Sequence, residues 1–500
     1  MLVFGVISSI LAASGAIAAP RQAPFSFSAP SPQWDPQEHM SGIARYHDAP
    51  GADVRPPPGC HVSASAYLIR HTAIGGNDEE WDEYMKGFVE KVTTYQDAKG
   101  SFKGAGPLAF LKNWKSVVTE DTIEQVTEPG KKDAFEFGKQ MRKLYPDLFP
   151  PKDLGTSKKR KGPKEPKVAF KVWTASSERD IDTSKAFIRG CFPKRHEGDG
   201  GEGDGKYVQL VEVPNKDPSW QGSLTPHKIC PAWTKEAGKP AARTWLSHYG
   251  PAPLARFKAL MPDFDWQLDD IIAMQMMCGY EETIQGRGTS HFCKQGLFTE
   301  EDFRSFGYFF DLFYNDVVGY NSPMAPYMGT PWLNVSAHNI LSADAPKHPH
   351  FEASKKKDGN LPDPDNPPDS THTQRIFVYF THREEPPVAL VALGIWNQTA
   401  LGGLPTDRMP PRDQYVWQTS HVLPFLGHVA LQRLDCGDHS EREGTYVRVV
   451  VNGAAQKLPR AELTDGPGNS CQIERFQSYV QERVDQYADF EGACRKEDSE

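Results

Sequence analysis

The sequence predicts an α/β fold: a doubly wound sheet flanked by helices, with an inserted, mainly helical cap. Two observations support this prediction. Short apolar runs at 64–69, 168–173 and 375–380 are each followed by a segment with helical periodicity, the order expected of parallel strands joined by crossover helices. Between the second and third of these units, residues 266–313 are mostly helical and aromatic in pattern, and this interruption predicts the cap.

The composition indicates a large folded chain. Of its 500 residues, 38% are hydrophobic and 11% aromatic, so a sizeable core can be buried. The net charge is −9, and a mildly acidic chain of this length is a poor candidate for binding nucleic acid or a membrane surface. The apolar stretch at the start of the chain is short for a membrane span, and no other segment approaches 18 consecutive apolar residues, so a membrane span is not expected either.

The first 19 residues predict a secretory leader. They are uncharged and apolar, and Ala16-Ile17-Ala18 offers the small-x-small pattern that signal peptidase accepts, with Pro20 soon after. Residues 20–57, rich in Pro, Ser and Ala, are interpreted as an extended N-terminal arm, and residues 58–500 as the main domain. The expected location is therefore outside the cell.

Cysteine usage agrees with an oxidising compartment. Eight cysteines follow the leader and no Cys-x-x-Cys pair is present, which favours disulfides over a zinc ribbon. Spacing alone leaves about 105 connectivities open. Two triplets, beginning at Asn334 and Asn397, are compatible with glycosylation.

Two histidines at the ends of predicted strands are the most informative residues. His71 follows Arg70 at the end of the first strand, and His382 ends a later strand, two residues before Glu384. In open α/β sheets, ligands bind where the carboxyl ends of the strands meet. We therefore expect these side chains to face one crevice.

The chemistry of these residue types points to phosphoryl transfer. An imidazole nitrogen can attack phosphorus, cationic donors stabilise the equatorial oxygens, and an acid protonates the leaving oxygen. On this hypothesis His71 is the nucleophile, Arg70 and His382 are donors, and Glu384 is the acid. Glu385 is a rival for the last role.

Around these residues the chain resembles the histidine acid phosphatases, the family that includes fungal phytases and multiple inositol polyphosphate phosphatases. The family motif Arg-His-Gly-x-Arg-x-Pro follows its first strand, and Arg-His-Thr-Ala-Ile-Gly-Gly stands there in this chain, at 70–76. The second motif, His-Asp or His-Ala-Glu, corresponds to His382-Arg383-Glu384. Weaker matches occur in order from about residue 58 to the C-terminal helix, for example Ala175-Ser176 with Arg179.

The resemblance implies a phosphoglycerate-mutase-like fold with the cap at roughly 190–345, and a phosphohistidine formed on His71. It further implies that Arg70, His382 and Arg383 bind the phosphate group of a small-molecule ester, with no cofactor and no metal. It also suggests three disulfides and leaves Cys191 and Cys471 either paired together or reduced. These disulfides are Cys60–Cys436, Cys278–Cys293 and Cys230–Cys494.

The chain departs from the family pattern at the anion site. Ile74 and Thr174 occupy the positions of two expected arginines, Thr72 replaces a glycine and Gly76 a proline. Each lost charge-assisted hydrogen bond is worth about 1.5–3 kcal/mol. Arg383 and Arg179 are the candidates to replace the lost charge, although the sequence does not show which way they point.

The predicted function is a secreted phosphomonoesterase of this type. The alternative is a non-phosphatase member of the fold, a pseudoenzyme or a pocket recruited to other chemistry, which the two missing arginines favour. Other sites are weaker: His348-Pro-His350 lacks the clustered carboxylates of a metal site, and the chain has no Gly-x-Ser-x-Gly elbow.

Overall fold

The computed structural model describes residues 34–150, 170–192, 208–216, 223–294, 296–342 and 374–496. Several predicted features lie outside these ranges: the secretory leader, the first part of the arm and the pair His348 and His350.

A single mixed sheet forms the centre of the molecule, with the strand order β3-β2-β4-β1-β5-β6-β7 and β8 beside β6. The first four strands in this order are parallel to one another, whereas β5 runs antiparallel to β1 and begins an antiparallel half. The strands are β1 (Cys60–Arg70), β2 (Phe170–Ala175), β3 (Val208–Val213), β4 (Ile376–Thr381), β5 (His428–Cys436), β6 (Gly444–Val451), β7 (Ala454–Gln456) and β8 (Cys471–Gln472).

The central strand β1 is buried on both faces. Tyr67 and Ile69 point into one hydrophobic core, and Ala66 and Leu68 into the other. This is why β1 shows a continuous apolar run in the sequence instead of alternation.

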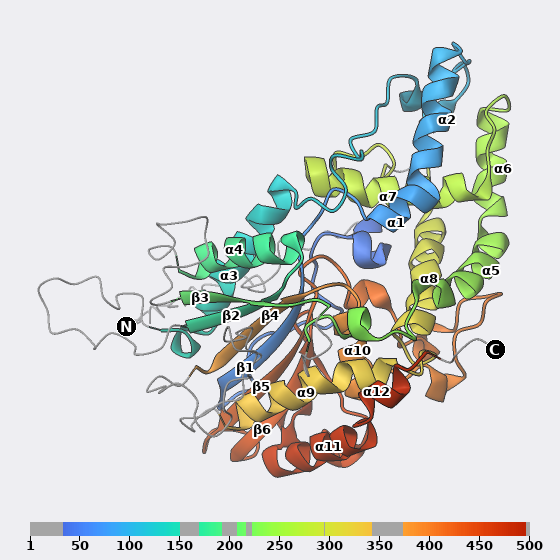
Figure 1. Cartoon of the computed structure of the whole chain (residues 1–500). Coiled ribbons are helices and arrows are strands. Elements are labelled where there is room, and N and C mark those ends of the chain that lie inside the picture. Colours follow the sequence, from blue (N-terminus) through green and yellow to red (C-terminus); the bar gives the residue numbers. More distant parts are fainter. Residues whose placement is uncertain are drawn as a thin grey trace, which may run out of the picture.

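Helices cover both faces of the sheet (Figure 1). On one face, α3 (Glu128–Leu144) crosses α4 (Glu178–Cys191) so closely that a Cβ on Gly190 would lie 2.0 Å from the carbonyl oxygen of Phe135. The other face carries α9 (Ala325–Leu341), α10 (Glu385–Ala392) and α11 (Ile473–Gln486). The predicted doubly wound α/β fold is confirmed.

A helical cap extends beyond the carboxyl edge of the parallel strands (Figure 1). Its helices are α1 (Asp78–Glu80), α2 (Lys86–Asp97), α5 (Lys239–Tyr249), α6 (Pro251–Leu260), α7 (Leu268–Gln285) and α8 (Glu300–Val317), and the short α12 (Phe490–Ala493) lies near the C-terminus. Within the range predicted for the cap, β3 belongs to the sheet and α9 packs against β1 and β5. The cap itself therefore starts after β3, ends before α9 and also takes in α1 and α2.

The described part of the N-terminal arm packs into the fold. Residues Pro36–His39 and Ser41–Ile43 form two 3-10 turns, and Met40 and Ile43 are fully buried. Ile43 lies against Gly279 of α7. The arm thus seals the junction between the cap and the sheet, and its residues from Pro36 to Ile43 are not extended.

The three disulfides implied by the resemblance are formed: Cys60–Cys436, Cys230–Cys494 and Cys278–Cys293. Cys191 and Cys471 are both buried and free, and the Cys191 thiol donates to the carbonyl oxygen of Gly138 instead. Among the described helices, none has the length and apolar character needed to cross a membrane.

Candidate active site

The two predicted motifs meet because their strands are parallel neighbours. Arg70 of β1 is paired in register with Thr381 of β4, so the residues that follow, His71 and His382, leave the same edge of the sheet. The backbone N–H of His71 donates to the carbonyl oxygen of Thr381 across 2.9 Å. The two imidazole rings lie 6.5 Å apart, centroid to centroid.

The hydrogen bond made by His71 fixes its tautomer. Its Nδ1 lies 2.9 Å from the carbonyl oxygen of Thr72, which can only accept, so Nδ1 carries the proton and Nε2 carries a lone pair. Burial, followed by the positive charges of Arg179 and Arg70, lowers the pKa of His71 well below its ordinary value. Burial and the two positive charges therefore both favour the neutral form of the ring.

Backbone carbonyl groups hold the Arg70 side chain in place. Its Nη1 donates to the carbonyl oxygens of Gly42 and Leu423, both at 2.5 Å, and its guanidinium lies 4.1 Å from the centre of the Phe425 ring. Its Nε is buried without a hydrogen-bond partner. Burial, with the like charge of Arg383, lowers the pKa of Arg70 to about 10, so it keeps its charge at neutral and acid pH.

Uncharged side chains occupy the positions of the two missing arginines. Ile74 is buried and its carbonyl oxygen accepts from Thr283, while the hydroxyl of Thr174 donates to the carbonyl oxygen of Ala175. Thr72, at the expected glycine, donates to the carbonyl oxygen of Gly130. These three side chains therefore offer an anion no charge.

Arg179 supplies a cation from a different place. It lies in the first turn of α4, which follows directly from β2 next to β4 in the sheet. Its charge acts on both His71 and His382, and its Nη1 pairs with Glu124. Its Nε is buried without a hydrogen-bond partner. Arg179 therefore brings a positive charge to both histidines, a charge that it shares with Glu124.

Arg383 is committed to a buried network. Its Nη1 donates to Glu80 Oε1 at 2.5 Å and its Nη2 to Asn77 Oδ1 at 3.0 Å, while Glu80 Oε2 accepts from the hydroxyl of Tyr280. Its Nε lies 3.7 Å from Glu384 Oε1. The predicted role of Arg383 as a direct phosphate ligand is not what this geometry favours, because its terminal nitrogens already have partners.

His382 is oriented by groups at the start of α4. Its Nε2 lies 3.0 Å from Ser177 Oγ and 2.8 Å from Asp180 Oδ2, and its Nδ1 is buried without a hydrogen-bond partner. Burial lowers the pKa of His382, and the Asp180 carboxylate acts in the opposite direction. A ring held at Nε2 in this way has Nδ1 left on the side of His227 and Glu384.

Glu384 is buried among cations. Lys235 Nζ lies 3.6 Å and Arg383 Nε 3.7 Å from its Oε1. Burial acts to raise the pKa of Glu384, but Lys235, His227 and Arg383 together hold it well below the usual range. Its rival Glu385 is turned away, because it accepts from Thr381 Oγ1 and is paired with the Nδ1 of His227.

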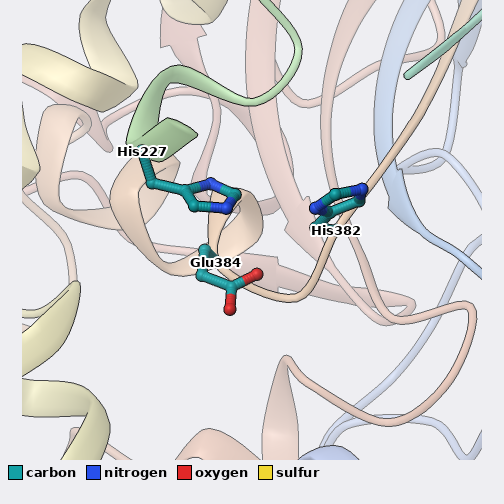
Figure 2. Close-up of side chains that lie close together, drawn as sticks. All are labelled: His227, His382 and Glu384. Atoms are coloured by element: carbon teal, nitrogen blue, oxygen red, sulfur yellow. The ribbon is translucent and has the colours of Figure 1, made fainter. Parts of the chain in front are cut away.

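His227 also lies at this site and was not found by sequence reasoning. It comes from the short turn Pro226–Ile229 between β3 and α5, and its ring lies 5.7 Å from that of His382. His227, His382 and Glu384 each present one ligand atom within 4.8 Å of the others, around a common space (Figure 2). Among the described residues, this is the group suited to holding a metal ion.

The structure therefore brings all five predicted site residues to one edge of the sheet. Sequence reasoning missed His227, Asp180 and Lys235, which come from elements far apart in the chain. For Asp180 a signal did exist, since it lies one residue from Arg179 at the start of a predicted helix. For His227 and Lys235, the sequence contained no motif or periodicity that indicated a place in the site.

The chain is similar in sequence to known phosphatases. The sequence matches the family model of the histidine phosphatase superfamily (branch 2) over residues 83–452. An acid phosphatase of Komagataella pastoris is 26% identical over 485 residues, covering 92% of this chain and 87% of that protein. An acid phosphatase of Schizosaccharomyces pombe is 23% identical over 451 residues, covering 89% of this chain and 86% of that protein.

The phytase from D. castellii has the same fold. It superposes with a TM-score of 0.71 at 24% sequence identity, covering 95% of this chain and 90% of the phytase. The family match begins after the divergent motif at 70–76 and still spans well over half of the sequence. The chain belongs to the histidine phosphatase superfamily, branch 2.

Proposed function

We propose that this protein is a secreted phosphomonoesterase that works through a phosphohistidine on His71. The observation that carries the proposal is the hydrogen bond from His71 Nδ1 to the Thr72 carbonyl oxygen, which leaves the Nε2 lone pair for attack. In the first step Nε2 forms a bond to phosphorus, and the bond from phosphorus to the leaving oxygen breaks. The pKa of His71 is lowered, so this lone pair is not lost to a proton in acid.

The surrounding charges stabilise the phosphoryl oxygens. Arg70 and Arg179 flank His71, and His382 presents Nδ1, which donates when the ring is protonated with Asp180 at its other nitrogen. Charge stabilisation of this kind supplies most of the catalysis in phosphoryl transfer. Arg383 has a different part: tied to Glu80 and Asn77, it positions the neighbouring Glu384.

Glu384 handles the proton. A bound phosphate ester places negative charge beside this carboxyl group, which opposes the cations around it and favours its protonated form. Glu384 then gives its proton to the leaving alkoxide. In the second step the resulting carboxylate takes a proton from water, which attacks phosphorus, breaks the bond to Nε2 and releases inorganic phosphate.

The substrate class follows from the chemistry and from the relatives. The family members compared above are acid phosphatases and a phytase, and we assign a small-molecule phosphate ester to this chain. No metal or cofactor is needed for the steps described. The apolar leader and three disulfides support secretion.

Hydrolysis of a chromogenic phosphate ester tests the proposal. We expect turnover by the wild type and its loss in His71→Ala, with a normal thermal transition showing that the variant is folded. Millimolar inorganic phosphate should raise the melting temperature of the wild type, because a ligand that binds only the folded state stabilises it. Turnover unchanged by His71→Ala would remove the mechanism, and no response to phosphate would favour the non-phosphatase alternative.

A further inference from the structure

Two imidazoles in the crevice are arranged as metal ligands usually are. In metal sites, a histidine that binds through one ring nitrogen almost always donates the other N–H to a carboxylate or carbonyl, which fixes its tautomer and direction. Here one ring nitrogen of His227 is paired with Glu385, and one ring nitrogen of His382 is paired with Asp180. The second nitrogens of the two rings lie on the sides that face each other (Figure 2). Glu385 takes no part in the phosphoryl-transfer steps proposed above, and Asp180 acts there only by orienting His382.

Several contacts orient His227. It lies in the short 3-10 turn Pro226–Ile229, directly before the Cys230–Cys494 disulfide, and its ring centre is 4.7 Å from that of Trp233. Its Nδ1 pairs with Glu385 Oε1. The carboxylate oxygen can only accept, so Nδ1 is the donor and Nε2 is left facing Glu384 and His382.

His382 offers the second nitrogen. Its Nε2 is 2.8 Å from Asp180 Oδ2, and its Nδ1 has no hydrogen-bond partner although the side chain is only 1% exposed. A buried, unpartnered ring nitrogen costs free energy unless a ligand satisfies it. This nitrogen belongs to the same space as His227 and Glu384 (Figure 2).

Glu384 offers the third ligand atom. Its contacts with Lys235 and Arg383, at 3.6 and 3.7 Å, are both made by Oε1. They are longer than hydrogen bonds, so they leave the carboxylate able to coordinate a cation. The positive charge of Arg383 is largely balanced by its own pair with Glu80, and that of Lys235 by Glu79.

We propose that His227, His382 and Glu384 bind a zinc ion. Two imidazole nitrogens and one carboxylate oxygen, with a position left open, are a donor set typical of zinc, whereas magnesium and calcium prefer all-oxygen sites. The three donor atoms lie within 4.8 Å of one another. A tetrahedral site with bonds of about 2.0–2.2 Å needs them about 3.4 Å apart, a closure within the reach of side-chain rotation.

The ion would act as an inhibitor of the reaction proposed above. It takes the Nδ1 of His382 and the carboxylate of Glu384, the groups assigned to the phosphoryl oxygens and the leaving group. Zinc and a phosphate ester therefore compete for this crevice. The inhibition rests on the proposed function, but the binding of zinc does not.

Calorimetric titration of the purified full chain with zinc chloride, at about pH 7 in a buffer free of phosphate, tests the proposal. We expect one zinc ion per chain. His227→Gln should weaken binding by at least 10-fold, and Glu385→Gln, which removes only the carboxylate behind His227, by about 10- to 100-fold. His248→Gln, on the exposed surface of α5, removes a histidine elsewhere and should leave the affinity unchanged.

A spectroscopic readout accompanies the titration. Cobalt(II) substituted for zinc should give the intense visible absorption of a tetrahedral site in the wild type and lose it in His227→Gln. Thermal unfolding shows whether each variant is folded. If His227→Gln does not fold, the comparison is made with Glu385→Gln alone. Absence of a one-to-one binding isotherm, or equal zinc affinity in the wild type and folded variants at 227 and 385, would overturn the proposal.

Measuring how zinc inhibits phosphate ester hydrolysis distinguishes the zinc proposal from the proposed function. His227 lies beside the proposed acid Glu384, so the zinc sensitivity of each protein is measured relative to its own zinc-free rate of hydrolysis of a chromogenic ester. His227→Gln should lose at least 10-fold in that sensitivity. Equal sensitivity in both proteins would contradict the zinc proposal. A wild type that binds zinc but hydrolyses no phosphate ester would contradict the proposed function alone.

Discussion

The Nδ1 of His71 donates to the carbonyl oxygen of Thr72, the very next residue, across 2.9 Å. This contact fixes the tautomer of the imidazole and leaves Nε2 with a lone pair. It also ties His71 to Thr72, the position where the family carries a glycine. Thr72 is anchored in turn, because its N–H donates to Thr183 and its hydroxyl to Gly130, so the added side chain stabilises this loop.

Replacement of Arg179 by Gln should impair catalysis. Its charge lies close enough to lower the pKa of His71, and in the mechanism we propose it supplies part of the positive charge that the two replaced arginines would have given. Loss of one charge-assisted interaction of about 1.5–3 kcal/mol corresponds to a fall in kcat/KM of about 10- to 100-fold. Steady-state kinetics with a phosphate ester measure it, and Arg412→Gln, an exposed arginine, is the control. Equal values for the two variants would rule out a role for Arg179 at the site.

Removal of the Glu80 carboxylate should destabilise the whole protein. Glu80 accepts from both Arg383 and Tyr280, and its loss leaves a buried guanidinium without its counter-charge. We expect Glu80→Ala to lower the free energy of unfolding by about 3–5 kcal/mol. The neighbouring Glu79, which pairs with Lys235 at the surface, provides the control: Glu79→Ala should cost less than about 1 kcal/mol. Denaturant unfolding compares them, and similar losses would contradict the buried network.

Protonation of His428 should weaken the fold in acid. Burial lowers the pKa of this ring from 6.5 to about 4. Between these two values the unfolded chain binds a proton that the folded chain does not, so the free energy of unfolding falls as the pH drops from 6.5 to 4. This residue contributes about 1.4 kcal/mol per pH unit to that slope.

The variant His428→Phe tests this slope. The ring lies among Tyr46, Tyr67 and Phe137, so phenylalanine suits the surroundings and cannot titrate. We expect a shallower dependence of the free energy of unfolding on pH between 6.5 and 4, by about one proton. The wild-type slope retained in the variant would show that other groups carry it.

The parts of the fold that sequence reasoning predicted are those set by local pattern. The strands β1, β2 and β4 are buried on both faces and therefore show apolar runs in the sequence. His71 and His382 directly follow two of these runs, and they were expected to lie together because ligands bind where the carboxyl ends of parallel strands meet. The described part of the arm was misjudged because its 3-10 turns are too short to show periodicity, although Met40 and Ile43 are fully buried.

The rest of the site depended on three-dimensional packing. Arg179 was considered as a replacement cation. The direction of its side chain depends on how α4 is rotated about its axis, which the sequence does not determine. Arg383 was assigned to the phosphate by its place in the motif, whereas Glu80, some 300 positions earlier in the chain, holds it. His227 lies beside Glu385 only because the chain returns to the sheet before entering the cap.

The most direct test of the central claim is to trap the phosphoenzyme. Wild-type protein is mixed with a phosphate ester labelled in the phosphoryl group, quenched in alkali within milliseconds and digested, and the labelled peptide is identified by mass spectrometry. The mechanism predicts a label that is stable in alkali, lost in acid and located on His71, and absent from folded His71→Ala. Turnover with no label on His71, or a label carried by another residue, would contradict it.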